Sequence, residues 1–111
     1  MESQESKHDQ VAIVAREMGD ALRRDVTSQA GRVRVSERNE GSRHVWRFRA
    51  DERSPERFLH IAHGTMTAGD NASAKLLAQL KKAEWSERLF GGSVTSLMLS
   101  PQGQLKPWPK Q

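Results

Sequence analysis

The sequence predicts an α+β fold, a two-layer sandwich in which both helices pack on one face of a mainly antiparallel sheet. Three observations predict it. Apolar residues recur at helical spacing near the N-terminus, the hydrophobic period then switches to two, and a second helical stripe follows. The expected element order is α-β-β-β-α-β-β. A length of 111 residues fits a single domain over 7–111, preceded by a frayed polar segment at 1–6.

The first helix is expected over residues 7–29. Ser6 and Asp9 form a capping box at its start, and Gly31 lies where a helix would stop. The core-facing stripe consists of Val11, Val14, Ala15, Met18, Leu22 and Val26.

The next two elements are expected to form a hairpin, because residues 32–36 and 46–49 alternate strictly and Asn39–Ser42 reads as a turn. The residues that face the core have odd numbers in the first strand and even numbers in the second. Because paired residues lie on the same face of the sheet, an odd-numbered residue must pair with an even-numbered one, and the two numbers of each pair sum to an odd number. A turn at Glu40-Gly41 satisfies this condition. It sets Val35 opposite Trp46 and Val33 opposite Phe48 on the core side.

The same register places like charges opposite one another on the outer side of the hairpin. It predicts three arginine pairs across the strands, namely Arg38 with Arg43, Arg34 with Arg47, and Arg32 with Arg49. Directly opposed like charges destabilise a sheet, so a compensating partner is expected for this face.

The rest of the chain is expected to complete the sheet and its helical layer. A strand at 58–62 and a loop at 64–69 lead to a helix that Asp70 or Asn71 caps and that ends at Gly91-Gly92. A strand at 94–99 then turns at Ser100–Gly103 into 104–106, and Pro107–Pro109 forms an extended tail. Whether the fourth strand neighbours the first or the third stays open. The expected core is Val33, Val35, Trp46, Phe48, Leu59, Ile61, Leu76, Leu77, Leu80, Leu97 and Leu99.

Composition excludes several classes of function. The chain has no cysteine, which excludes disulfides, a thiolate nucleophile and zinc sites built on cysteine. No apolar run approaches the length of a membrane span, and the polar, acidic N-terminus does not resemble a signal peptide. We therefore expect a cytoplasmic protein without a membrane partner, and no residue pattern indicates a cofactor.

The arginines are the strongest indication of function. The formal net charge is only +4, but eight arginines fall between residues 31 and 57. Such a face is either simply solvated, or it binds the carboxylates of a protein partner, or it binds nucleic-acid phosphates. Stacking of single-stranded bases would also need aromatic rings, and Phe58 is the candidate if the third strand turns it outward. The expected partner-binding residues are Arg32, Arg34, Arg38, Arg43, Arg47 and Arg49.

The order helix, three strands, helix resembles that of the double-stranded RNA-binding domain. That family binds through its helices and a loop, with a lysine cluster opening its last helix. Here Lys81-Lys82 lie late in the second helix, and Asp70 opens it, where an acid would repel phosphate. The resemblance covers element order and not the residues that bind RNA.

A second constellation is expected at the turn end of the sheet. The hairpin register faces Glu37 toward His44, and pairing of Phe48 with Leu59 would bring His63 opposite His44. A carboxylate and two imidazoles are groups that bind metals or transfer protons, although polar side chains at a sheet end are commonly only solvated.

The second helix leaves one more alternative. If it is continuous, Ala74, Ala78, Trp85 and Leu89 form an external apolar strip suited to a homodimer. If it bends near Trp85-Ser86, the indole is buried instead.

These observations favour a small non-enzymatic binding or regulatory module that docks an acidic protein on its arginines. The alternative is a nucleic-acid-binding protein that uses the same arginines. A small enzyme ranks third, because we identify no catalytic residues in the sequence.

Overall fold

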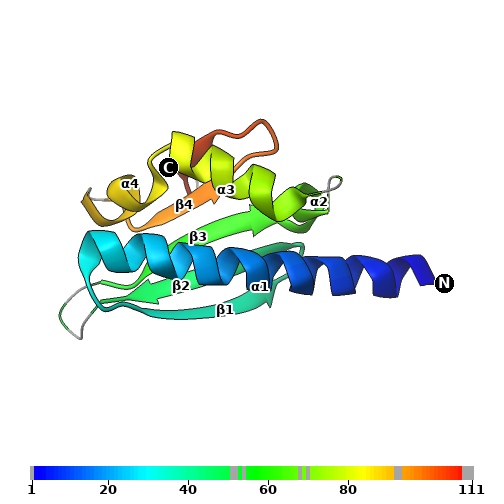
Figure 1. Ribbon diagram of the computed structural model, residues 1–111, viewed down its shortest axis with the longest axis horizontal. Helices are drawn as coiled ribbons and strands as arrows, with labels where there is room; N and C mark the ends of the chain where they lie inside the picture. Colours follow the sequence, from blue (N-terminus) through cyan, green and yellow to red (C-terminus); the bar gives the residue numbers. More distant parts are fainter. Residues whose placement is uncertain are drawn as a thin grey trace.

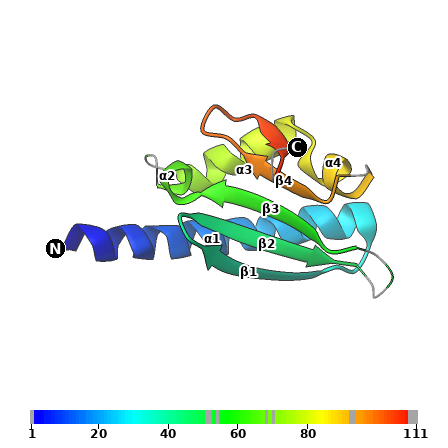
Figure 2. The ribbon, with the colours of Figure 1, turned by 180° about the vertical axis from the view of Figure 1, so that it is seen from behind.

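The computed structural model describes residues 2–50, 53, 55–67, 69, 71–91 and 94–108, and the side chains of these except in residues 2–9, 29 and 30. It confirms the predicted α+β sandwich. Helices cover one face of a five-stranded sheet, and the opposite face is turned toward the viewer in Figure 2 (Figures 1 and 2). The elements are, in order, α1 (Glu2–Ala30), β1 (Arg34–Glu40), β2 (Arg43–Arg49), β3 (Arg57–Ala62), α2 (His63–Met66), α3 (Ala72–Lys82), α4 (Trp85–Gly91), β4 (Ser96–Leu99) and β5 (Leu105–Pro107).

The strands follow one another across the sheet in the order β1-β2-β3-β4-β5. Neighbouring strands are antiparallel except β3 and β4, which run parallel because three helices connect them. The fourth strand therefore neighbours the third. β1 and β5 are the two edges of the sheet, and Pro107 is tolerated in β5 because an edge strand needs fewer backbone donors.

The β1–β2 register confirms the predicted parity but is shifted by two residues. Glu40 pairs with Arg43, so the loop is Gly41-Ser42 and not Glu40-Gly41. Gly41 takes the positive φ, +63°, as the first of two loop residues, which is the requirement of a type II′ turn. Glu40 at that loop position would need a left-handed backbone itself, which its side chain disfavours.

This shift removes the predicted arginine pairs. Val35 faces Phe48 and not Trp46, and on the outer side Arg34 faces Arg49. Arg47 lies opposite Ser36, Arg38 opposite Val45, and Arg43 opposite Glu40. One like-charged pair is therefore formed where three were expected.

The β2–β3 register is likewise shifted by two residues from the prediction. Leu59 lies opposite Trp46, and Phe48 lies opposite Arg57. His63 does not lie opposite His44 in the sheet, because β3 ends at Ala62 and His63 begins α2.

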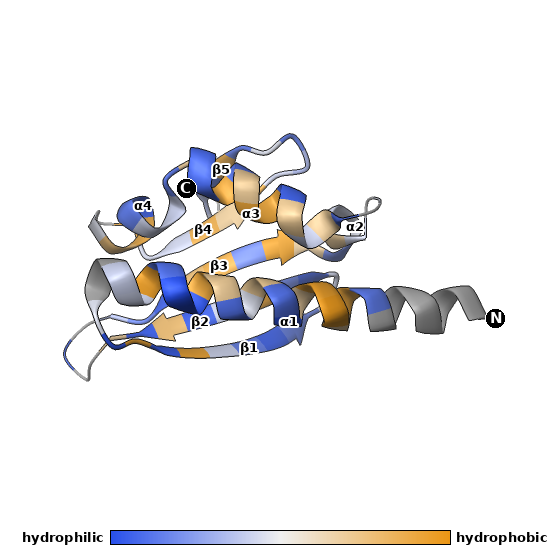
Figure 3. Ribbon diagram, in the orientation of Figure 1, coloured by the Kyte–Doolittle hydropathy of each residue, from blue (hydrophilic) through white to orange (hydrophobic). Residues whose placement is uncertain are grey.

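Helix α1 begins at Glu2, earlier than the expected residue 7, so residues 2–6 are helical. The predicted stripe of α1 is confirmed, since all six residues from Val11 to Val26 are buried. Figure 3 shows these apolar residues recurring along α1 between hydrophilic ones (Figure 3).

The core lies between the sheet and the helices. Nine of the eleven predicted core residues are buried, and the other two, Val35 and Leu77, are half-buried and pack against the core. Trp46 belongs to this core and is fully buried. Met66 in α2 is also buried, although the sequence suggested only a loop there.

The second helical segment breaks between α3 and α4. Asn71 precedes α3 without a side-chain capping bond, and Asp70 lies outside the described residues. At the break Glu84 adopts φ +55°, and its N–H donates to the Lys81 carbonyl. The turn brings Trp85 and Leu89 into the core, where both are buried. Of the two alternatives, the bend that buries the indole is confirmed. The external strip is wrong for Trp85 and Leu89, and only Ala74 and Ala78 of that strip are exposed.

The C-terminal hairpin forms as predicted. The Gly103 N–H donates to the Ser100 carbonyl, and Leu99 pairs with Leu105. In the part of the chain that the structure describes, no helix combines the length and apolar character needed to cross a membrane.

Candidate functional site

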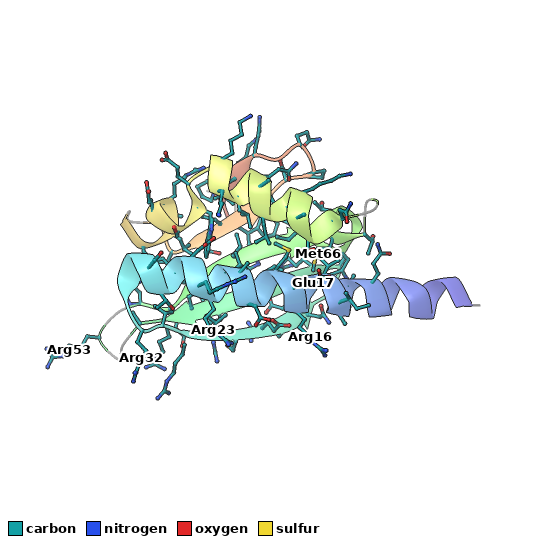
Figure 4. The ribbon with its side chains drawn as sticks, in the orientation of Figure 1. Arg16, Glu17, Arg23, Arg32, Arg53 and Met66 are labelled. Carbon is teal, nitrogen blue, oxygen red and sulfur yellow. The ribbon has the colours of Figure 1, made fainter. Side chains whose placement is uncertain are left out.

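The uncovered face of the sheet carries five arginines from β1 and β2. Strand alternation aims them all away from the helices, so they form one surface, which we call the arginine face: Arg34, Arg38, Arg43, Arg47 and Arg49. Arg32, the sixth predicted residue, precedes β1 and is also exposed; Figure 4 shows it near that end of the sheet (Figure 4).

Glu40 holds two of these arginines. One of its carboxylate oxygens lies 2.6 Å from Arg38 Nη2, and the other accepts a hydrogen bond from Arg43 Nη2 at 3.1 Å. Because the Arg38 side chain remains 62% exposed, water and salt screen this pairing.

Glu56 lies between two other arginines in the same way. Its oxygens are 3.8 Å from Arg47 Nη1 and from Arg49 Nη1, and Arg47 Nε donates to Ser36 Oγ at 3.1 Å. Exposed pairs at such distances contribute between 0 and about 1 kcal/mol. These contacts therefore orient the guanidinium groups and leave them able to bind a further anion.

Arg34 is different. It forms no ion pair with any residue that the structure describes, and it lies directly opposite Arg49. Positive charge is consequently least compensated at the β1 start of the arginine face.

An apolar patch adjoins the arginine face on the same side of the sheet. It consists of Val45, which is buried, and the half-buried Phe58, Met98 and Trp108. Phe58 faces outward opposite Arg47, as strand alternation allows. Trp108 is fixed by its backbone N–H, which donates to the Ser96 carbonyl. The Arg43 guanidinium lies 5.4 Å from the centre of the Trp108 ring, within the range of a cation–π contact.

His60 connects the patch to the arginines. Its Nδ1 accepts a hydrogen bond from Arg43 Nε at 3.2 Å, so Nε2 carries the proton and donates to Ser96 Oγ at 2.9 Å. Burial, reinforced by the nearby Arg43 charge, lowers the pKa of His60 to about 4. The ring is therefore neutral at physiological pH and holds Arg43 in place.

The predicted group of Glu37, His44 and His63 lies on the face of the sheet that the helices cover. Asn39, which the sequence analysis did not identify, contacts both histidines. His44 Nδ1 and His63 Nε2 lie 2.8 and 2.9 Å from the same Asn39 Oδ1. Since this oxygen only accepts, both nitrogens carry the proton. Glu37 Oε1 lies 3.4 Å from His44 Nε2. We call these four residues the histidine cluster.

The histidine cluster does not have the arrangement of a metal site. Among the described residues, no group of three His, Cys, Asp or Glu side chains is placed to hold a metal ion. Each imidazole instead directs one nitrogen to Asn39. Burial lowers the pKa of His44, and the Glu37 carboxylate offsets this only in part.

Gly19 of α1 lies against the histidine cluster. A Cβ at this position would be 3.2 Å from Glu37 Oε2 and 3.7 Å from Trp46 Nε1. Glycine within a helix costs roughly 0.5–1 kcal/mol relative to alanine, and here its absence of a side chain lets the carboxylate approach the helix.

Comparison of the chain with protein-family models, with curated proteins and with solved structures finds no match. The functional argument therefore rests on the two surfaces of this chain, the arginine face and the histidine cluster.

Proposed function

We propose that this protein is a binding module that docks an acidic protein partner on the uncovered face of its sheet. The observation that carries the proposal is that the arginine face and the apolar patch share one surface. Arg, Trp, Phe and Met are the residue types enriched at protein interfaces, and all four occur there.

The geometry supports carboxylates as the groups recognised. Glu40 and Glu56 each lie between two guanidinium groups of the arginine face, so these side chains already have orientations that receive carboxylate oxygens. Arg34 offers a further cation without a described ion pair. A partner that covers Phe58 and Trp108 would exclude water from the surrounding charge pairs and strengthen them.

A second candidate is binding of single-stranded nucleic acid, favoured by Phe58 and Trp108. Such proteins combine positive charge along the phosphate backbone with aromatic rings on which bases stack. Both rings are half-buried and lie beside arginines.

Binding measurements with two labelled probes test the proposal. One probe is a peptide rich in glutamate and leucine, and the other is a single-stranded DNA of thymidines; each is titrated at about 50 and about 200 mM salt. We expect the peptide to bind, and the Arg34→Ser/Arg49→Ser variant to bind it at least about tenfold more weakly.

The matched control removes two positive charges from the helical side of the molecule. Arg24 in α1 and Arg88 in α4 are both exposed. The Arg24→Ser/Arg88→Ser variant should retain peptide affinity within about twofold. Equal weakening by both variants would reduce the effect to net charge and contradict a specific face. Tighter binding of the DNA, with affinity falling steeply with salt, would favour the second candidate instead.

A further inference from the structure

A pocket of about 540 Å³ lies at the free edge of β1, where the charge of the arginine face is least compensated. It extends around that edge, since its lining includes the outward-facing Arg34 and also Val35, which packs against the core. Arg23 reaches the pocket from α1, on the helical side of the sheet (Figure 4). The pocket therefore extends beyond the arginine face and adds a residue that the proposed function does not use.

The pocket is strongly positive. Four of the seven residues that line it are arginines, and none of the seven is acidic; the arginines are Arg23, Arg34, Arg47 and Arg49. Arg23 and Arg34 form no ion pair with any residue that the structure describes. In the same part of the chain, Glu56 is the carboxylate paired with the other two, 3.8 Å from each. Four guanidinium groups thus share one carboxylate.

This concentration of charge has a cost for the sheet. Arg34 lies directly opposite Arg49, and like charges in that position destabilise the pairing of two strands. Arg23 adds a third positive charge from the helix side of the same pocket. An anion bound between these side chains would offset the repulsion, and an anion with two negative charges would offset more of it than a carboxylate does.

A phosphate monoester matches the pocket better than a carboxylate. It carries a charge of about −1.5 to −2 at neutral pH and offers three acceptor oxygens. Guanidinium groups bind phosphate oxygens in pairs through their planar fork. Ser36 Oγ, which also lines the pocket, accepts a hydrogen bond from Arg47 Nε at 3.1 Å and retains its own hydrogen to donate to a phosphate oxygen.

The distribution of charge favours a single phosphate over a nucleic-acid backbone. A nucleic acid requires positive charge repeated along its path, because its phosphates repeat. Beyond the pocket, Arg38 and Arg43 of the arginine face are both paired with Glu40. The uncompensated charge is therefore concentrated at one place, as suits one phosphorylated side chain.

We propose that this pocket binds a phosphoserine or phosphothreonine of the acidic partner, with the phosphate between Arg23, Arg34 and Arg49. The inference rests on the proposed function and assigns its regulation: phosphorylation of the partner strengthens docking. The carboxylates and apolar side chains of the partner lie on the uncovered face, and the phosphate lies at the β1 edge, where Arg23 also contacts it.

A set of matched peptides tests the proposal on the full chain. The glutamate- and leucine-rich peptide described above receives one serine, placed in turn at its start, centre and end. Each peptide is compared with its phosphoserine form and with a form that has glutamate at the same position. At the best position, the phosphoserine peptide should bind at least about tenfold more tightly than the other two.

Arg23 separates this pocket from the arginine face. Arg23→Ser should reduce the gain from phosphorylation to less than about threefold and leave the affinity for the unphosphorylated peptide within about twofold. The matched control is Arg24→Ser, the next residue of α1, which is equally exposed and does not line the pocket. It should leave both affinities within about twofold. Thermal melts verify that both variants are folded.

A neutral peptide of glycines with one phosphoserine distinguishes failure of this inference from failure of the proposed function. NMR of the arginine Nε–H groups should show that it binds in the millimolar range and requires Arg23. If it does so while the unphosphorylated acidic peptide does not bind, the pocket stands and the proposed function fails. If the acidic peptide binds and phosphorylation adds less than about twofold at every position, this inference alone is overturned.

Two further outcomes would also overturn it. Equal affinity for the phosphoserine and glutamate forms would show that the pocket binds a carboxylate. Tighter binding of the thymidine DNA than of any phosphopeptide, weakened equally by Arg23→Ser, would assign the pocket to a nucleic-acid backbone.

Discussion

The environment of His60 depends on contacts that strand alternation alone does not indicate. His60 lies on the uncovered face of the sheet, yet it is 6% exposed, because Phe58 and Trp108 lie on either side of it. Its neutral ring fixes Arg43 through Nδ1 and Ser96 through Nε2. Burial disfavours the charged form of the ring, and protonation would also place a positive charge against Arg43, so the pKa of His60 is lowered to about 4.

We expect the protein to lose stability as pH falls from about 6.5 to about 4. The unfolded chain binds a proton at His60 with the usual pKa of 6.5, and the folded protein binds it only near pH 4. Between these values protonation favours the unfolded state, so the contribution is complete above pH 6.5 and is lost on acidification. It amounts to about 3 kcal/mol at most.

Urea unfolding at a series of pH values measures this loss. In His60→Gln the loss between pH 6.5 and 4 should be clearly smaller, and His44, whose pKa is also lowered, accounts for part of the remainder. An unchanged pH profile in the variant would show that His60 is not the responsible group.

At the scale of single residues, hydrophobic alternation was sufficient to predict which side chains face the core. It identified Trp46 and Phe48, and it also aims Phe58 outward. It could not indicate Trp108, which reaches the same face through a backbone bond to β4, far away in the sequence. The role of Asn39 could not be predicted either, because it depends on contacts with His44 and His63. His63 reaches Asn39 because α2 begins directly after β3.

At the scale of elements, the turns fixed the strand registers, which hydrophobic periodicity left open. Alternation of inward residues restricted the β1–β2 register to choices that differ by two residues, and the position of the glycine in the turn selected one of them. Gly41 had to be the first loop residue, which moved every pair by two. No glycine or proline marks the break before Trp85, so the sequence left both a continuous helix and a bent one open. It exists because a continuous helix would leave Trp85 and Leu89 outside the core.

Glu84→Gly should stabilise the protein by about 0.5–1 kcal/mol. Glu84 has φ +55°, a left-handed backbone that glycine adopts without steric cost. The neighbouring Ala83 provides the control, because its φ of −84° is that of an ordinary helical residue. Ala83→Gly should instead lower stability by a similar amount. Thermal or urea unfolding measures both, and stabilisation by neither or by both would contradict the strain assigned to Glu84.

At the scale of the whole molecule, α1 determines the shape. Its 29 residues span about 43 Å at 1.5 Å per residue, close to the longest molecular dimension of 46 Å (Figure 1). Its buried stripe belongs to the same core cluster as residues of the sheet, α3 and α4. The helix is therefore part of the core along the sheet and not an appendage to it.

We expect a single cooperative unfolding transition as a result. Circular dichroism, dominated by the helices, and tryptophan fluorescence, dominated by the buried Trp46 and Trp85, should give coincident urea curves. Leu22→Ala in α1, which empties a fully buried position, should shift both curves together by about 2–5 kcal/mol. Separation of the two curves would show that α1 unfolds independently of the sheet.

The edge position of β1 has a consequence for aggregation. An exposed edge strand offers unpaired backbone groups to any other extended chain, and β1 pairs only with β2. Glu37, whose side chain is 41% exposed, points from this edge toward α1. A strand added alongside β1 would cover that carboxylate and would also lie against Arg34 and Arg38. Inward charge on an edge strand disfavours pairing with another chain. The same carboxylate that faces His44 in the histidine cluster therefore also protects the sheet from edge-to-edge polymerisation.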